Sequence, residues 1–302
     1  MIVIRTVEND ADIDTYLAVR NRVHPETPIH RDAMRDLRRH LNSLDLIAEL
    51  DGVPVGAGSI GKFGGAPDSD LAYLTLRVVR EARRQGVGTA LDRRASEHAR
   101  VLGKQRCTVS VRRDDADSLS YFAARRFTEV GWMQDVRLDL STASVDEPQV
   151  PAGVEIVAAS TPELEQGAYE VALEADADIP TGVTIESGTF DRWRERHFGD
   201  RTLRELSFVA LENGHVIGYA ILGRHTDEAA QHWMTGVARA ARGRGIARAL
   251  KQAQIAGAKA AGWKYLDTQN DLGNAPMRRV NEKLGYVRKF EWVHLTGPLL
   301  ED

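Results

Sequence analysis

The sequence has little of several features that would direct a protein to a particular class. Its 302 residues include one cysteine, Cys107, which excludes an internal disulfide and a cysteine-rich metal site. No apolar run approaches the roughly 20 residues that cross a bilayer. The first residues, MIVIRTVENDADIDTYL, lack the basic start and apolar core of a signal peptide. A net charge of −4 gives no general attraction for nucleic acid. We therefore expect a cytoplasmic protein that binds no membrane, nucleic acid or metal.

Two familiar nucleotide-binding motifs are also absent. The stretches ARRQGVGTAL (82–91) and ARGRGIARAL (241–250) are rich in glycine and arginine, but Leu91 and Arg248 stand where the dinucleotide-binding motif needs its third glycine. The Gly-Lys-Ser/Thr sequence of the P-loop does not occur. The two stretches therefore need another explanation.

The two stretches belong to an internal repeat. A shift of 159 residues superimposes them and continues without a gap to Phe127, which meets Tyr286. Upstream, IAELDGVPVGAGSI (47–60) matches VALENGHVIGYAIL (209–222) at a shift of 162. Their Asp-Gly and Asn-Gly pairs predict hairpins with type I′ turns. We place the three-residue difference in the loop between the hairpin and the next strand, and we infer a duplicated domain.

The boundary between the copies is predicted at STASVDEPQVPAG (141–153), a small, polar, proline-containing linker. The expected domains are residues 1–140 and 154–302. Each half has the pattern strand, one or two helices, hairpin, long strand, glycine turn, helix, strand, helix and strand. This order predicts the α/β (α+β) class, with two tandem domains that each have a mixed central sheet flanked by helices.

The helix after the second glycine turn is expected from about Ile246 to Ala260. Apolar residues, Ile246, Ala249 and Leu250 among them, follow the i, i+3, i+4 spacing of one buried face. The exposed face is expected to carry Arg248, Lys251, Gln252 and Lys259.

The glycine turns have the properties of anion sites. The first N–H groups of a helix lack partners within the helix, and glycine lets the backbone approach a ligand closely. Arginine at a helix N-terminus is electrostatically unfavourable by itself, so two such turns indicate an anion nearby. A phosphate or pyrophosphate is the expected ligand.

The pattern Arg-x-x-Gly-x-Gly/Ala, which occurs twice after a long strand, resembles the pyrophosphate loop of the GNAT superfamily of acyl-CoA-dependent N-acyltransferases. The stretch TQNDLGNAPMRRVNEKLGYV (268–287) resembles the Asn-rich turn and helix that follow the next strand in that family. The doubled pattern is similar to the tandem, two-domain GNAT type. The resemblance implies that acetyl-CoA is bound by Val78, Val79, Arg83, Arg84, Gln85, Gly86, Val87 and Gly88 in the first half, and by Val237, Ala238, Arg242, Gly243, Arg244, Gly245, Ile246, Ala247, Asn274 and Asn281 in the second.

The resemblance also implies a reaction. The long strand and its successor would splay apart and admit the pantetheine arm, and backbone amides near Val78 and Val237 would face the acetyl carbonyl. An amine would attack directly, with the oxyanion stabilised by those donors. The expected activity is N-acetyl transfer to a primary amine of a small molecule or peptide, by a monomer or homodimer.

The sequence leaves more than one candidate for the general acid and for the general base of this reaction. Many family members have a tyrosine acid five residues before the aromatic residue of the Gly-Phe/Tyr pair, and that position is Asn281 in the second half and Phe122 in the first, beside Tyr121. Asn281 could hold a water or the sulfur but cannot donate a proton as an acid, so Tyr121 is the other candidate. For the base, three residues lie nearby: Asp70, Glu228 and His232.

A competing hypothesis is a CoA-binding regulatory or structural module in which one or both halves are catalytically inactive. Between the halves, we favour the second for chemistry because it has Asn274, Asn281 and Gly285. The acceptor is expected to be selected by residues 10–45 and 160–205, where the halves differ most.

Overall fold

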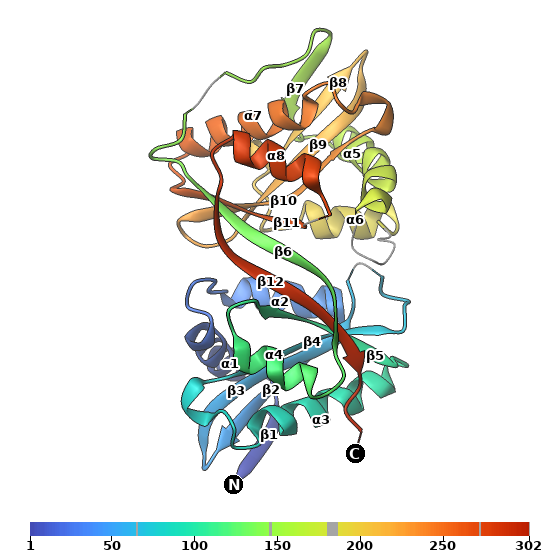
Figure 1. The fold of residues 1–302 in the computed structure, drawn as a ribbon. Helices are drawn as coiled ribbons and strands as arrows, with labels where there is room; N and C mark the ends of the chain where they lie inside the picture. Colours follow the sequence, from blue (N-terminus) through green and yellow to red (C-terminus); the bar gives the residue numbers. More distant parts are fainter. Residues whose placement is uncertain (65, 145–146, 180–186, 272, 302) are drawn as a thin grey trace. The chain divides into compact units, whose positions relative to one another are not determined.

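A computed structural model describes residues 1–64, 66–144, 147–179, 187–271 and 273–301 (Figure 1). The chain forms two compact units. Unit 1 comprises Met1–Val130 together with Trp292–Asp302, and unit 2 comprises Gly131–Glu291. No helix in the described ranges is long and apolar enough to cross a bilayer.

Unit 1 is built on a mixed sheet with the order β1-β2-β3-β4-β5-β12, in which β4 and β5 are parallel and the other pairs are antiparallel. Helices α1 and α3 both pack on β3, whose residues Val55, Gly56, Ala57 and Gly58 are all buried. Successive strand residues face opposite ways, so this run shows that both faces of the sheet are covered. The elements are β1 (Ile2–Thr6), α1 (Asp10–Val23), α2 (Arg31–Leu41), β2 (Leu44–Leu50), β3 (Val53–Lys62), β4 (Leu71–Val78), η1 (Arg80–Ala82), α3 (Val87–Val101), β5 (Arg106–Arg112), α4 (Ala116–Ala123) and the start of β6 (Thr128–Asp139).

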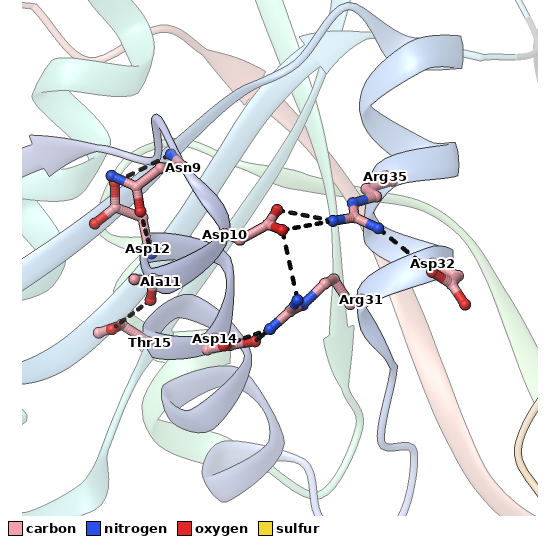
Figure 2. A network of polar contacts seen from close by, with 9 residues as sticks. All are labelled: Asn9, Asp10, Ala11, Asp12, Asp14, Thr15, Arg31, Asp32 and Arg35. Carbon is pink, nitrogen blue, oxygen red and sulfur yellow. Dashed lines mark hydrogen bonds and ion pairs between the residues drawn. The ribbon is translucent and has the colours of Figure 1, made fainter.

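Helix α1 begins with a capping box, in which the side chain of Asn9 accepts from the backbone of Asp12 and the side chain of Asp12 accepts from the backbone of Asn9 (Figure 2). Ion pairs connect this helix to α2: Arg31 contacts Asp14 at 2.5 Å and Arg35 contacts Asp10 at 2.8 Å. These pairs are exposed, so they orient α2 more than they stabilise it.

Unit 2 repeats the architecture with the sheet order β6-β11-β10-β9-β8-β7. Helix α7 packs on β9 through Ile246 and Leu250, which lie against Gly218. On the other face, the Tyr219 hydroxyl contacts Asp176 at the end of α5. The elements are β7 (Val154–Ala158), α5 (Pro162–Ala175), η2 (Asp176–Asp178), α6 (Phe190–His197), η3 (Arg204–Leu206), β8 (Phe208–Glu212), β9 (His215–Arg224), β10 (Ala229–Val237), η4 (Arg239–Ala241), α7 (Ile246–Ala260), β11 (Tyr265–Asp271), α8 (Ala275–Lys283) and β12 (Val287–Pro298). The predicted fold class and duplication are confirmed.

The predicted hairpin turns are also confirmed. Asp51 and Gly52 have φ of 51° and 80°, and Asn213 and Gly214 have φ of 52° and 78°. Positive φ at both central residues is the requirement of a type I′ turn, which Asp-Gly and Asn-Gly meet with little strain.

The prediction that the three-residue difference between the repeats lies in a single loop is wrong, because two separate changes produce it. The loop after the hairpin spans residues 63–70 in unit 1 and 225–228 in unit 2, four residues fewer. β10 contains one residue more than β4, and the pairing of β10 with β9 shifts there, between His232 and Met234. Trp233 is therefore a β-bulge, and His232 corresponds to Leu74, since they pair with Leu222 and Ile60 at the same hairpin position.

The two units exchange strands. Residues Trp292–Pro298 of β12 pair with Arg106–Arg112 of β5 in unit 1. Residues Met133–Asp139 of β6 pair with Tyr265–Asp271 of β11 in unit 2. Each sheet therefore contains a strand from the other end of the chain. Gln149, in the segment predicted as a linker (141–153), lies in unit 2, and its amide donates to Gln252 of α7 at 3.2 Å.

The predicted exposed face of α7 is partly wrong. Lys259 is exposed, but Lys251 and Gln252 are 1% and 4% exposed. The i, i+3, i+4 pattern correctly identified the face against the sheet, but it did not predict that a second side of the helix is covered. Residues near Gln149 and Tyr286 supply that cover.

The strand exchange predicts that the C-terminal segment protects Cys107. This cysteine lies in β5 opposite Gly297, is buried, and has a thiol pKa that burial raises. We expect Cys107 in the intact chain to resist a thiol reagent, and a chain ending at Glu291 to react roughly tenfold faster or more, because β5 loses its partner strand. Reagent kinetics, with total thiol counted in denaturant, measure this. Equal protection in both chains would contradict the exchange.

Candidate functional site

Both sheets open at the same place. The parallel pairing of β4 with β5 covers Leu71–Tyr73, and that of β10 with β11 covers Ala229–Gln231. Beyond these residues each strand continues with its antiparallel neighbour. We call the opening beyond the last parallel pair the fork. This geometry agrees with the splayed strands expected from the family resemblance.

The backbone amides at the end of the fork alternate in direction. The amide of Ala238 donates to Ile217 of β9, and the amide of Val79 donates to Val55 of β3. Because successive strand residues direct their backbone groups to opposite edges, the amide of Val237 faces the fork. Val78 is the corresponding residue of unit 1. Of the predicted strand-end residues, Val78 and Val237 therefore have the orientation that a donor to a ligand requires.

The fork of unit 2 is distinguished by the bulge at Trp233. Bulges re-aim the backbone and side chains next to them and are frequent beside active sites. In unit 1 the register of β4 with β3 runs without interruption from Ala72 to Val78. The two forks therefore differ in backbone geometry as well as in side chains.

The glycine turns place open helix N-termini beside each fork. Gly86 and Gly245 are the N-cap residues of α3 and α7, with φ of 87° and 89°. Glycine has no side chain to cap the helix, so the first amides of each helix remain available to an anion. A Cβ at Gly243 or Gly245 would meet no atom within 4 Å, and one at Gly86 would make only an ordinary contact with Ile2 at 3.5 Å, so neither turn is closed by neighbouring side chains.

One arginine of each turn hydrogen-bonds to the end of the preceding strand and so stabilises the turn. The Nε of Arg83 donates to the carbonyl of Val78 at 3.3 Å, and the Nε of Arg242 donates to the carbonyl of Val237 at 3.0 Å. This repeated contact ties the turn to the end of the strand. It accounts for the arginine in the pattern without a ligand.

Carboxylates of the protein compensate the arginine charges. In unit 1, Arg83 makes two hydrogen bonds of 3.1 Å to Asp115, and Arg84 contacts Asp117 at 3.3 Å. In unit 2, Asp178 contacts both Arg239 and Arg242, which hold the pKa of its carboxyl well below the usual range. Arg244 pairs with Glu212. The sequence predicted an anion near these arginines. It did not indicate that carboxylates distant in the chain are those anions.

Unit 1 has a cavity of about 380 Å³ beside its turn. Its lining includes Arg83, Arg84, Asp115, Asp117, Tyr121 and Arg125. The Tyr121 hydroxyl donates to the buried Asp92 at 3.0 Å, and the Arg125 guanidinium lies 3.6 Å from the centre of the Tyr121 ring. Burial and the Asp92 charge raise the pKa of Tyr121.

The two predicted asparagines have different environments. Asn274 is the N-cap of α8, and its Oδ1 accepts from the amide of Met277 at 3.2 Å. Asn281 is buried, and its Nδ2 donates to Asn270 of β11 at 2.6 Å. Within the described ranges, the Oδ1 of Asn281 has no hydrogen-bond partner. A buried acceptor without a partner is costly, which favours a role toward a ligand.

The three candidate bases separate into two kinds. Asp70 and Glu228 lie at the entry to β4 and β10 and form ion pairs with Arg106 and Lys264. His232 is buried, and its Nδ1 lies 2.8 Å from Gln254 while its Nε2 contacts the Tyr286 hydroxyl. Burial and the charge of Lys251 lower its pKa, so His232 is neutral at pH 7.

Unit 2 buries polar side chains at positions near the start of its fork where unit 1 is mostly apolar. The corresponding residues, unit 1 first, are Leu74 and His232, Asp92 and Lys251, Ala95 and Gln254, Val111 and Asn270, Phe122 and Asn281, and Phe127 and Tyr286. Burying polar groups opposes folding unless they are satisfied or used. Five of these six positions in unit 1 belong to its hydrophobic core.

Comparison with known proteins now identifies the family. The sequence profile of the acetyltransferase (GNAT) family matches residues 11–127 and 171–286. This chain belongs to the GNAT family. It is 29% identical over 262 residues to a mycothiol acetyltransferase of Thermomonospora curvata, covering 86% of this chain and 84% of the relative.

Solved structures show the same fold. A tandem GNAT protein from the clavulanic acid biosynthesis pathway matches with a TM-score of 0.81 and 21% identity, covering all of both chains. A GCN5-related N-acetyltransferase from Sphaerobacter thermophilus matches with a TM-score of 0.77 and 20% identity, covering 99% of this chain and 96% of that one. The tandem GNAT arrangement predicted from the repeat is thereby confirmed.

The contacts of Tyr121 predict the effect of its substitution. In Tyr121→Phe the buried Asp92 loses its hydroxyl donor, so we expect a loss of about 1–3 kcal/mol in the free energy of unfolding. We expect acetyl transfer to change little, because the hydroxyl is already bound by Asp92. Denaturant unfolding and steady-state kinetics measure the two effects. A large fall in turnover with unchanged stability would instead support Tyr121 as the acid.

Proposed function

We propose that this GNAT protein transfers the acetyl group of acetyl-CoA to a primary amine of a small molecule or peptide, and that unit 2 carries out the transfer. The observation that carries the assignment to unit 2 is the set of buried polar side chains near the start of its fork, at positions where unit 1 has mostly apolar core residues. The bulge at Trp233 supports it.

Each part of the unit 2 site would have a separate role in the reaction, determined by its position. The turn Gly243–Ala247 and the N-terminus of α7 would bind the diphosphate through backbone amides. The pantetheine arm would lie in the fork between β10 and β11. The amide of Val237 would donate to the acetyl oxygen as the amine attacks and negative charge develops there. The name of the mycothiol acetyltransferase relative supports the reaction class.

A second role suits unit 1, which we propose to be a non-catalytic CoA-binding or structural module. Its cavity contains Asp115 and Asp117, whose carboxylates occupy the arginines of its turn. Unit 2 has Asn274 and Pro276 at these two positions, neither of which is charged. The turn arginines of unit 2 are paired as well, with Asp178 and Glu212, so the proposed difference between the units rests on the residues around the fork.

Matched substitutions in the two turns test the division. Gly245→Glu and Gly86→Glu introduce the same charge at the same helix position and at nearly the same positive φ, so their effects on folding should be similar. We expect Gly245→Glu to lower acetyl transfer roughly 100-fold or more, and Gly86→Glu to leave it largely unchanged. Thiol release from acetyl-CoA with a panel of amines measures transfer.

Calorimetry with CoA provides the accompanying control. The unsubstituted protein should bind CoA, and Gly245→Glu should remove the site that supports turnover. Equal losses of turnover in the two variants would contradict the division between units. An unsubstituted protein that binds no CoA would contradict the proposed function itself.

A further inference from the structure

Lys251 is a buried cation without a buried counter-ion. It lies in the second turn of α7 and is 1% exposed. Its Nζ lies 5.6 Å from the centre of the Tyr286 ring, and no carboxylate pairs with it in the part of the chain that the structure describes. Burial lowers the pKa of its ammonium group to about 7. A charged amine is seldom buried in this way without a partner.

The groups around Lys251 do not supply that partner. On β10, both ring nitrogens of His232 are occupied by Gln254 and Tyr286. The amide nitrogen of Gln254 donates to the carbonyl of Leu206, which directs its oxygen to His232. On β11, the carboxylate of Asp267 is held by Arg137 through two hydrogen bonds of 2.7 Å.

Lys251 lies near the point where β10 and β11 separate to form the fork. His232, whose pKa the charge of Lys251 lowers, is the first residue of β10 after the last parallel pair, Gln231 with Asp267. Tyr286 follows α8 and its amide donates to the carbonyl of Asn281. Lys251 therefore lies close to His232 and Tyr286, at the point where β10 and β11 separate.

In unit 1, the position that corresponds to Lys251 holds a buried charge whose partners are present. Asp92 corresponds to Lys251, with the same place on the helix and similar burial. Three neighbours compensate Asp92: it accepts from Tyr121 at 3.0 Å and from Ser96 at 3.4 Å, and its carboxylate lies 3.6 Å from Arg125. Evolution of the second copy has placed a cation there without such partners, which points to an anionic group that arrives with the ligand.

We propose that Lys251 stabilises and protonates the CoA thiolate that leaves during acetyl transfer in unit 2. This inference rests on the proposed function. The amine nitrogen forms a bond to the acetyl carbon, the carbon–sulfur bond breaks, and its electron pair stays on sulfur. The ammonium of Lys251 gives a proton to the sulfur, directly or through one water, and becomes neutral. The proton that the acceptor amine loses to water then balances the one that Lys251 regains from water.

The pH dependence has a definite sign. The acid must be protonated to act, so on the alkaline side of the profile turnover by the unsubstituted protein should fall tenfold per pH unit above the pKa of Lys251. Lys251→Met should lower turnover roughly 100-fold or more and abolish this alkaline decline. Lys251→Arg keeps the charge but cannot titrate in this range, so its turnover should be low and should lack the decline. Lys259→Met, an exposed lysine of the same helix, is the matched control.

A second measurement does not depend on turnover. The thiolate absorbance of bound CoA reports the pKa of its thiol, which should be lower in the unsubstituted protein than in Lys251→Met. Methionine in this buried site removes an uncompensated charge, so the melting temperature of Lys251→Met should equal or exceed that of the unsubstituted protein. If Lys251→Met does not fold, Lys251→Gln replaces it in both measurements.

The outcomes separate the two proposals. If the unsubstituted protein binds CoA but Lys251→Met has the same turnover, pH profile and bound-thiol pKa, the role of Lys251 is overturned and the proposed function stands. If the unsubstituted protein binds no CoA, the proposed function fails and this inference fails with it. A lower bound-thiol pKa together with the loss of the alkaline decline would support the assignment.

Discussion

The short parallel pairing between β10 and β11 is the constraint on which the site of unit 2 depends. Three residue pairs hold the strands together, and beyond them each strand continues with its antiparallel neighbour. The amide of Val237, the turn at Gly245 and the start of α7 therefore border one opening. Longer pairing would close the fork, and shorter pairing would leave the two strands without a fixed separation.

Comparison of the two copies shows which features the fold requires. The bracing contact of Arg83 and Arg242, the left-handed glycine before the helix and the short parallel pairing occur in both units. The bulge at Trp233 and the buried polar side chains near the fork distinguish unit 2. Features common to both copies serve the scaffold, and the differences indicate where chemistry has been retained or lost.

Local sequence patterns predicted the local structures well. The turns at Asp51 and Asn213, the glycine N-caps and the bounds of α7 follow from residues close together in the chain. The repeat and the family resemblance extended these elements to a fold and to a candidate anion site.

Features that depend on distant residues were not predictable in the same way. Asp115 and Asp178 approach arginines far along the chain, and nothing in their local sequence indicates this. Lys251 has the spacing of an exposed residue, and its burial comes from elements that cover α7 from a second side. The bulge at Trp233 was concealed because a shorter loop and an inserted residue together produced one net shift in the alignment.

The exchange of β6 and β12 has a consequence for how the protein is made. The amide of Leu300 donates to Ser96 of α3, 204 residues earlier, and β12 completes the sheet that β5 began. A ribosome therefore synthesises all of unit 2 before the strand that finishes unit 1 emerges. Until then the edge of β5 is open, and its pairing contributes contacts of very long sequence separation, which slow folding. Duplication of a gene has here produced a chain whose first domain is the last to be completed.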